Sequence, residues 1–322
     1  MDFAPFDAAA LGELVIDLIP VAQQSGPPLY AARPGGAPGN VAAGLARLGI
    51  RALMLSKVGP GAFGDLLIGT LAAAGVATSG IARAANEPTA LAVVSLAENG
   101  DRDFTLYRQG CADANFSEDE LPIEALRDCR LLHVGSLSLA TPVSAGAQRR
   151  AIAAVRAGGG MISADVNLRP ALWRDLGAMR ATGIEAAAAA NILKVSEEEL
   201  DLLTGTSDIK AGAQVLWHPS LQLLAVTRGS AGATLLTRDH RVEVPSVPVR
   251  VVDTVGCGDA FMAALLAGVL QHGTASLSER HLGALGRYAC LAGAVMAGIS
   301  GAMAAMPQRA DIEALQHSVG DR

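Results

Sequence analysis

Short apolar runs alternate with alanine-rich segments along this chain, and the alternation leaves few folds open to it. Apolar runs of strand length occur within residues 131–135, 161–166, 192–195 and 223–227. Alanine is the best helix former, so alanine-rich stretches such as 185–190 favour helices. Strands that alternate with helices predict βαβ units and a parallel sheet. The expected fold class is therefore α/β.

Composition and charge narrow the classes of function. The 322 residues carry a net charge of −6 and no basic run, which argues against nucleic acid as the main partner. The apolar run at 260–270 is too short to cross a bilayer, and residues 1–5 do not resemble the start of a signal peptide. The four cysteines lack metal-type spacing, which indicates reduced thiols in a cytoplasmic protein. No linker or repeat is evident, so we expect residues 1–322 to form a single domain.

Residues 253–261 read Asp-Thr-Val-Gly-Cys-Gly-Asp-Ala-Phe and run into an apolar, helix-like segment. The two glycines permit a sharp turn, and a turn that opens into a helix presents unpaired backbone N–H groups and the positive end of the helix dipole. Such a turn suits a phosphate. Asp259 at its rim could accept a proton from a substrate hydroxyl. The alternative is that Asp259 only caps the helix.

A second glycine-rich segment occupies residues 35–49. Gly35 and Gly36 permit close approach of the backbone to a ligand, and Asn40 is placed to cap the helix that follows. Taken alone, a glycine-rich loop before a helix is weak evidence for a ligand. Upstream, Asp17 interrupts an apolar run, which fits either a ligand-binding acid or an acid at a strand edge.

Polar residues follow two of the apolar runs. Asp165, Asn167 and Arg169 alternate after the second run, and ligands gather at the carboxyl ends of strands in open parallel sheets. The same residues could instead be turn formers. Ser196 and Glu199 follow the third run with the spacing of a helix capping box, which is a sufficient structural explanation for both.

Both glycine-rich segments match motifs of a known family. Residues 253–261 fit D-T-x-G-x-G-D-x-F, and residues 35–42 fit G-G-x-x-x-N-x-A. The chain therefore resembles the ribokinase-like (PfkB) sugar kinases, and the resemblance extends from Gly12 to Pro307. It implies a three-layer α/β/α ribokinase-like fold with a central, mostly parallel sheet and a small β lid.

The lid implied by the resemblance is built from about residues 18–34 and 88–110. Residues 98–101 contain Asn-Gly, which tolerates positive φ and favours a hairpin turn between two strand-like segments. A lid matters to a kinase, because excluding water from the site prevents wasteful hydrolysis of ATP.

The resemblance also implies catalytic and sugar-binding roles. Asp259 would be the general base, and the backbone amides of the turn from Gly256 through Cys257 and Gly258 would hold the transferring phosphoryl group. Arg169 would stabilise the charge of that group. The implied sugar-binding residues are Asp17, Gly35, Gly36, Asn40 and Arg108.

Nucleotide and cation sites are implied by other segments. The implied cofactors are ATP and Mg²⁺, with Glu199 holding water on the metal, whereas Ser196 stands where the family motif N-x-x-E has asparagine. A potassium ion is an open question, because Ala305 replaces a serine that often supplies one oxygen. The implied nucleotide-binding residues are Lys194, Ser196, Thr227, Gly229 and Gly232, and the implied potassium ligands are Asp253 and the carbonyls of Val255, Met296, Ile299 and Gly301.

Within the family, the chain is most similar to fructokinases. The strings Gly-Glu-x-x-x-Asp, Gly-Gly-Ala-Pro-Gly-Asn, Tyr-Arg…Ala-Asp and Leu-Trp-His-Pro carry this likeness. It implies transfer of the γ-phosphoryl group of ATP to the 6-hydroxyl of D-fructose. The alternatives are a 2-keto-3-deoxygluconate kinase and a sugar- or nucleotide-binding protein that has lost the chemistry. The expected partners are a small sugar and ATP, with neither nucleic acid nor membrane, and the sequence leaves a monomer or a homodimer open.

Overall fold

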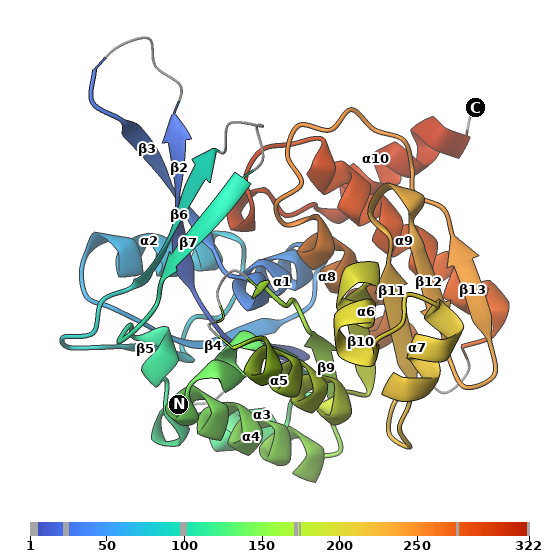
Figure 1. The fold of residues 1–322 in the computed structure, drawn as a ribbon, viewed down its shortest axis with the longest axis horizontal. Helices are drawn as coiled ribbons and strands as arrows, with labels where there is room; N and C mark the ends of the chain where they lie inside the picture. Colours follow the sequence, from blue (N-terminus) through green and yellow to red (C-terminus); the bar gives the residue numbers. More distant parts are fainter. Residues whose placement is uncertain are drawn as a thin grey trace.

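The strands of the protein form two sheets in a computed structural model that describes residues 6–21, 26–96, 102–170, 173, 175–274 and 277–320 (Figure 1). Nine strands from these residues form the larger sheet, in the order β13-β12-β11-β10-β9-β8-β1-β4-β5. The pairs from β11 through to β5 are parallel, whereas β12 and β13 pair antiparallel at one edge. The strands are β1 (Ala8–Leu11), β4 (Ala52–Val58), β5 (Ile81–Arg83), β8 (Leu131–Gly135), β9 (Met161–Asp165), β10 (Ile192–Ser196), β11 (Leu223–Thr227), β12 (Ala233–Leu236) and β13 (Arg241–Val244).

The larger sheet is buried on both faces, which explains its continuous apolar runs. Successive side chains of a strand point to opposite faces. In β1, Ala8 and Ala10 therefore join one hydrophobic core, and Ala9 and Leu11 join the other. Two cores that share one sheet make a three-layer α/β/α arrangement, as the sequence predicted.

Helices cover the two faces in two groups. The first face is covered by α1 (Ala37–Arg47), α2 (Ala62–Ala73), α8 (Cys257–His272), α9 (Glu279–Ala297) and α10 (Arg309–Gly320). The second face is covered by α3 (Ile123–Arg127), α4 (Pro142–Ala157), α5 (Leu176–Ala189), α6 (Glu197–Thr204) and α7 (Ile209–Leu216). Short 3-10 helices lie in the connections: η1 (Asp113–Asn115), η2 (Glu118–Glu120), η3 (Leu137–Ala140), η5 (Gly229–Ala231) and η6 (Met303–Ala305).

The smaller sheet stands away from the main body in Figure 1. Its order is β3-β2-β6-β7, with bounds β2 (Val15–Val21), β3 (Leu29–Gly35), β6 (Ala90–Leu96) and β7 (Arg102–Tyr107). We refer to these four strands as the lid. The predicted hairpin turn at 98–101 and the N-terminal residues 1–5 lie outside the described residues. The single-domain extent of 1–322 stays a prediction.

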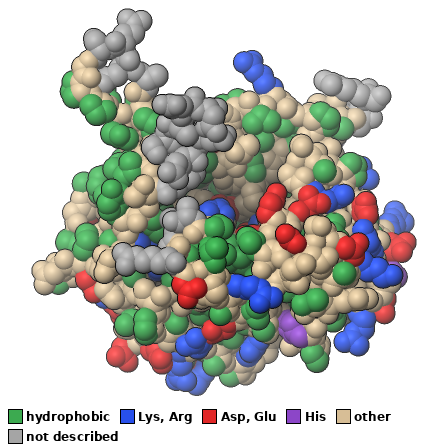
Figure 2. All heavy atoms as spheres, viewed as in Figure 1, with side chains coloured by type: hydrophobic (Ala, Val, Ile, Leu, Met, Phe, Trp, Pro, Cys, Tyr) green, Lys and Arg blue, Asp and Glu red, His purple; other side chains and the backbone are tan. Residues whose placement is uncertain are grey.

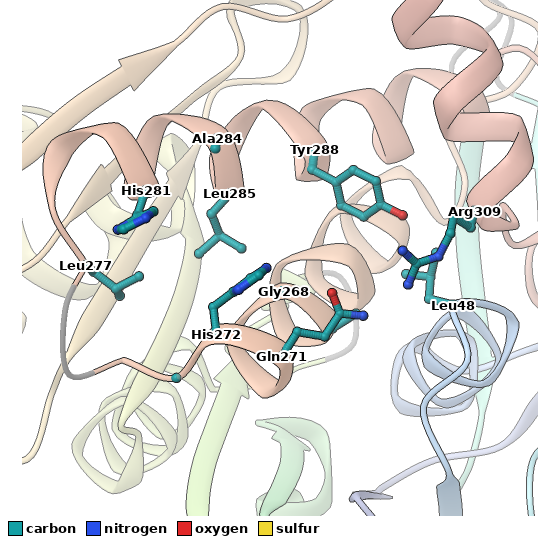
Figure 3. Close-up of a pocket in the computed structure, with 12 residues that line it drawn as sticks. Leu48, Gly268, Gln271, His272, Leu277, His281, Ala284, Leu285, Tyr288 and Arg309 are labelled. Carbon is teal, nitrogen blue, oxygen red and sulfur yellow. The ribbon is translucent and has the colours of Figure 1, made fainter.

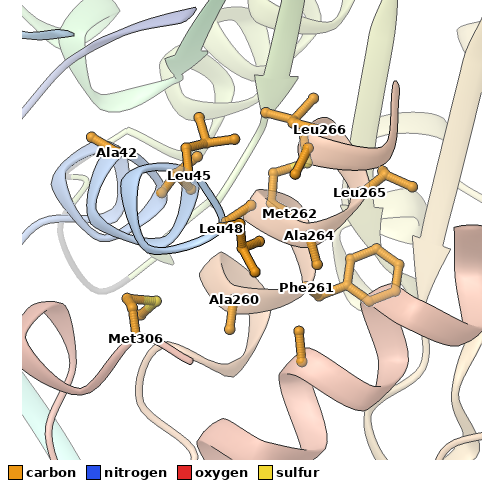
Figure 4. Packing of buried hydrophobic residues seen from close by; sticks show 14 of the residues in the cluster. Ala42, Leu45, Leu48, Ala260, Phe261, Met262, Ala264, Leu265, Leu266 and Met306 are labelled. Carbon is orange, nitrogen blue, oxygen red and sulfur yellow. The ribbon is translucent and has the colours of Figure 1, made fainter. Parts of the chain in front are cut away.

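Helices α1 and α8 pack against each other in the hydrophobic core and link the two glycine-rich motifs (Figure 4). A Cβ atom added at Gly44 of α1 would lie only 2.6 Å from the Cβ of Ala263 on α8. Real Cβ atoms do not approach so closely, so glycine at position 44 sets the distance between the helices.

Two further observations bear on the environment of the protein. None of the helices in the described ranges is both long and apolar enough to cross a membrane. All four cysteines are free thiols.

Candidate active site

Several residues of the candidate site lie at the carboxyl ends of the parallel strands, where an open α/β sheet binds its ligands. Glu13 follows β1, Asp165 ends β9, Ser196 ends β10 and Thr227 ends β11. The N-termini of α1 and α8 face the same edge. Figure 2 shows the surface hollowed between the lid and the body of the larger sheet.

The turn before α8 has the geometry of an anion site. Gly256 is the N-cap with a φ of 81°, a left-handed conformation that favours glycine, and no side chain caps the helix. The backbone N–H groups of Gly258 and Asp259 have no acceptor among the described residues. Unpaired N–H groups at the positive end of a 16-residue helix can bind a phosphoryl group.

Asp259 lies in the first turn of α8, beside Asn40 in the first turn of α1. The N-cap of α1 is Gly36, so the prediction that Asn40 caps this helix is wrong. The Nδ2 atom of Asn40 donates a hydrogen bond of 2.7 Å to Oδ2 of Asp259. Burial, followed by the nearby charge of Asp165, raises the pKa of Asp259 to about 6, against the opposing effects of Asn40, Lys194 and Arg169. A carboxylate with this pKa is ionised at neutral pH and suited to accept a proton.

Asp17 of β2 belongs to the same group of side chains. Burial and the charge of Asp259 raise its pKa to about 6. A Cβ atom added at Gly35 would lie 2.5 Å from Oδ2 of Asp17, so glycine at position 35 leaves the space that this carboxylate occupies. The structure thus brings Asp17, Gly35, Asn40 and Asp259 together.

Lys194 forms a buried ion pair with Asp165. The two residues are partners in the register of β10 and β9, and Nζ lies 2.8 Å from both carboxylate oxygens. Burial opposes the charge of Lys194, but the carboxylates of Asp165, Glu199 and Asp259 outweigh it and raise its pKa. A Cβ atom added at Gly258 would lie 3.3 Å from Nζ, so the ammonium group adjoins the anion turn.

Glu199 forms the predicted capping box with Ser196 at the start of α6. Its Oε2 accepts the N–H of Ser196 at 2.8 Å, and its Oε1 accepts the N–H of Leu168 at 2.6 Å. Burial is the largest influence on Glu199 and raises its pKa. Each carboxylate oxygen retains a further lone pair for water.

Arg169 is exposed, and its Nη1 donates to the carbonyl of Leu168 at 3.0 Å. Its positive charge nevertheless opposes the rise in the pKa of Asp259, which indicates that the guanidinium lies within electrostatic reach of that carboxylate. Asn167 has a φ of 47°, and it is the only non-glycine residue with a positive φ in the described ranges. This backbone turn separates Arg169 from β9.

Arg108 is buried, and its side chain contacts other partners than the remaining predicted sugar-binding residues. Its Nε donates to Oδ2 of Asp113 at 2.5 Å, and its Nη1 donates to the carbonyl of Leu137 at 3.2 Å. Nη2 of Arg108 and Oδ1 of Asp113 are buried without a partner within the described structure. A sugar role for Arg108 stays a prediction.

The predicted nucleotide-binding residues follow adjacent strands. Ser196 and Thr227 are partners in the register of β10 and β11. Gly229 begins η5, separated from the end of β11 by one residue, and is exposed, and Gly232 follows η5. Lys194 is buried within β10, and its ammonium group lies beside the anion turn.

The predicted potassium ligands come from two neighbouring segments. The N–H groups of Val252 and Asp253 both donate to the carbonyl of Ala297, which ties the turn before α8 to the end of α9. Oδ1 of Asp253 accepts the N–H of Val255 at 3.1 Å. Beyond Ala297, the loop carries Gly301 with a φ of 120°.

That loop also contacts the lid. Nη1 of Arg33 on β3 donates to Oγ of Ser300 at 2.8 Å. Neither residue was identified from the sequence, where they are 267 positions apart. Glu13 was also missed as a site residue, although it is an acid in the apolar run that contains Asp17 and belongs to the Gly-Glu-x-x-x-Asp string.

A cavity of about 410 Å³ lies far from this chemistry (Figure 3). It is lined by the C-terminal end of α8, the first half of α9 and the start of α10, with His272, Tyr288 and Arg309 among its residues. The N-terminus of α8 carries Asp259, so the cavity lies at the opposite end of that helix.

The site can be compared with known proteins. The model of the pfkB family carbohydrate kinases matches residues 6–309. Fructokinase-1 of Oryza sativa subsp. japonica is 36% identical over 313 residues, which are 96% of this chain and 97% of that protein. Probable fructokinase-3 of Arabidopsis thaliana is 38% identical over 311 residues, which are 95% of this chain and 89% of that protein.

Two solved structures of fructokinases are also similar to this chain. A fructokinase from Xylella fastidiosa with bound ATP has a TM-score of 0.90 at 32% identity and covers 98% of this chain and 99% of its own. A fructokinase from Vibrio cholerae O395, bound to fructose, ADP and calcium ion, has a TM-score of 0.85 at 33% identity and covers 96% and 98%. These likenesses confirm the predicted fold class.

Proposed function

The chain belongs to the pfkB family of carbohydrate kinases, and on this premise we propose that it is an ATP-dependent fructokinase. It transfers the γ-phosphoryl group of ATP to the 6-hydroxyl of D-fructose. The observation that carries the proposal is the contact between Asn40 and Asp259, because it joins the two family motifs in one site. The full-length likeness to fructokinases supports the choice of sugar.

In this proposal Asp17 and Asn40 hold the sugar with its 6-hydroxyl against Asp259. Asp259 accepts the hydroxyl proton as the oxygen bonds to the γ-phosphorus. The bond from that phosphorus to the bridging oxygen breaks, and ADP leaves with the electron pair. The phosphoryl charge is held by the backbone amides of the turn from Gly256 to Asp259.

Two cationic side chains, Lys194 and Arg169, support the same step. Lys194 directs two of its three N–H bonds to Asp165, which leaves the third for the phosphoryl oxygens beside Gly258. Arg169 is exposed at the rim, where it can move onto the transferred group. Thr227, Gly229, Gly232 and Ser196 border the nucleotide at the ends of β10 and β11.

The residues present fit Mg²⁺, which is bound chiefly by substrate phosphates and water. Glu199 has lone pairs left for a metal-bound water, and the metal supplies neutralisation of phosphate charge. Potassium is proposed at Asp253 and the carbonyls of Val255, Met296, Ile299 and Gly301. The tie from Asp253 to Ala297 supports it by joining the two segments.

A sugar panel tests the proposal. The purified chain is assayed with ATP and Mg²⁺ on fructose, glucose, ribose and 2-keto-3-deoxygluconate, with and without K⁺, and the product is identified by ³¹P NMR. We expect fructose 6-phosphate as the main product. Faster turnover of the keto acid would reassign the substrate. Turnover of no sugar, together with retained binding, would indicate a non-catalytic protein.

The remaining predictions concern the setting of the enzyme. We propose a cytoplasmic location, which the four free thiols support because such thiols persist in reducing compartments. A homodimer is one of the two states that the sequence leaves open.

A further inference from the structure

Glu13 occupies the connection between β1 and β2, at the edge of the sheet that carries the site. It is only 7% exposed. Its Oε1 accepts the backbone N–H of Ala37 at 3.1 Å. Its own carbonyl oxygen lies 2.3 Å from the position that a Cβ of Gly36 would take. Glu13 therefore contacts the glycine loop through both its side chain and its backbone.

Helix α1 needs such a partner because its own sequence provides none. Its N-cap is Gly36, with a φ of 108° and no side-chain hydrogen bond, and its first turn contains no acidic residue. Unsatisfied N–H groups and positive dipole charge gather at a helix N-terminus. The carboxyl group of Glu13 supplies the missing acceptor from another part of the chain.

The segment held by Glu13 carries two groups of the proposed reaction. Gly35 leaves the space for the Asp17 carboxylate, and Asn40 donates to Asp259 at 2.7 Å. Ala37 lies between them in the sequence. A shift of the N-terminus of α1 would therefore move Asn40 relative to Asp259.

Glu13 also faces the buried pair of Arg108 and Asp113. Burial raises the pKa of Glu13 to about 7, the charge of Asp113 adds to this rise, and the charge of Arg108 and the N–H of Ala37 oppose it. The carboxyl group can accept the N–H of Ala37 whether it is protonated or ionised, so the position of its oxygen, not its charge, is what the glycine loop requires.

We propose that Glu13 is a positioning residue for phosphoryl transfer, which holds the glycine loop and the N-terminus of α1 so that Asn40 is aimed at Asp259. In this role it acts through Asn40, not through the sugar or the nucleotide. The inference rests on the proposed function, and it assigns a role to an acid of the Gly-Glu-x-x-x-Asp string.

Two variants distinguish the position of the Glu13 side-chain oxygen from the charge of its carboxylate. Glu13→Gln keeps an oxygen at the same distance from Ala37 but removes the charge, whereas Glu13→Asp keeps the charge and withdraws the oxygen by one methylene group. We expect Glu13→Gln to stay close to the natural chain. Glu13→Asp should lower kcat/KM for fructose by roughly 10- to 100-fold, since small misplacements of reacting groups cost about this much. The KM for ATP should change little.

Asn191→Ala is the matched control. Oδ1 of Asn191 accepts the N–H of Ile162 at 2.8 Å, so it is also a side-chain acceptor for another segment, but at the amino ends of β9 and β10. This variant should lower Tm and leave both KM values and kcat unchanged. The inference is wrong if Glu13→Gln is as impaired as Glu13→Asp, or if Glu13→Asp lowers Tm without changing fructose kinetics.

Failure of the proposed fructokinase activity would give other results than failure of the role proposed for Glu13. If the natural chain phosphorylates no sugar in the panel, the fructokinase proposal fails. Fructose binding by calorimetry then tests Glu13 separately, with weaker binding expected for Glu13→Asp and near-natural binding for Glu13→Gln. Equal binding by all three proteins would overturn the role of Glu13.

Discussion

Asp259 is a carboxylate in surroundings that disfavour its charge. Burial and Asp165 raise its pKa, and the hydrogen bond from Asn40, together with Lys194, limits the rise. The balance leaves it ionised near neutral pH and more basic than an exposed aspartate. That is the property required of a general base that works on a sugar hydroxyl.

Replacement of this base is the most direct test at the residue scale. Asp259→Asn should reduce kcat by about 10²–10⁴-fold, the usual contribution of a general base. Fructose should still bind, because the amide can accept the hydrogen bond from Asn40. Steady-state kinetics and calorimetry measure the two quantities.

The thermal stability of Asp259→Asn at two pH values provides the control for its activity. The pKa of Asp259 is raised from 3.8 to about 6 on folding, so its favourable contribution is complete below pH 3.8 and is lost as pH rises through 6. Asp259→Asn should therefore have a higher Tm than the natural chain at pH 8, and the difference should shrink at pH 4. A lower Tm at pH 8 would mean that lost activity reflects unfolding.

The pH dependence of activity follows from the same pKa. The base must be deprotonated, so kcat/KM for fructose should be level above about pH 7 and fall about tenfold per pH unit well below pH 6. Asp17 has a pKa of about 6 as well, and its protonation should steepen the acid limb. A profile that stays flat down to pH 5 would contradict the assignment of Asp259.

The ion pair of Lys194 and Asp165 allows a prediction about stability and catalysis together. Lys194→Met leaves a buried carboxylate unpaired and should cost about 3–5 kcal/mol of unfolding free energy. Asp165→Asn in the same chain should recover most of this loss, because it removes the unpaired charge. Catalysis should not recover, since the ammonium beside Gly258 is still missing. Urea unfolding and kcat of the single and double variants check both statements.

At the scale of elements, the strands of the larger sheet could be predicted because each is buried on both faces and reads as a continuous apolar run. The anion turn could be predicted because Gly256, Gly258 and Asp259 adjoin in sequence. The pairing of Lys194 with Asp165 could not, because it depends on the register between β9 and β10. Glu13 was missed because one acid in an apolar run does not indicate which backbone group it meets.

The contact between lid strand β3 and the loop after α9 could not be predicted from local sequence patterns. Arg33 and Ser300 form a single hydrogen bond across 267 positions. It joins the lid to the segment that is proposed to bind potassium. A displacement of one segment should therefore displace the other.

A double-mutant cycle tests this coupling. Arg33→Ala and Ser300→Ala should each raise the KM for fructose by roughly 2- to 10-fold, the equivalent of one hydrogen bond of about 0.5–1.5 kcal/mol. The double variant should show no larger effect than either single one, because both remove the same bond. Additive effects on KM would show that the two side chains act separately.

At the scale of the molecule, the site lies where the lid, the sheet edge and two helix N-termini meet, while the two cores lie on either side of the sheet. The order of motifs in the sequence was enough to predict this arrangement through resemblance. The spatial relation between lid and body was not, since it depends on contacts such as Arg33 with Ser300.

The site lies where the lid, the sheet edge and two helix N-termini meet. We therefore expect the binding of a ligand there to stabilise the whole molecule. Fructose at about 100 times its Kd should add about 2.7 kcal/mol to the unfolding free energy. Asp259→Asn should show a comparable rise in Tm with fructose, whereas Asp17→Ala should not. A rise in Tm that is equal with glucose and fructose would contradict selective recognition of the sugar.

The glycine–alanine contact between α1 and α8 has a consequence for how such an enzyme can diversify. Helix α1 carries Asn40, which is proposed to hold the sugar, helix α8 carries the proposed base Asp259, and the two helices meet with no spare room at Gly44 and Ala263. Any bulkier pair would spread the helices and part the alcohol from its proton acceptor. New sugar preferences are therefore expected to arise by changes in the lid and the residues around it, while the contact between these two helices is retained.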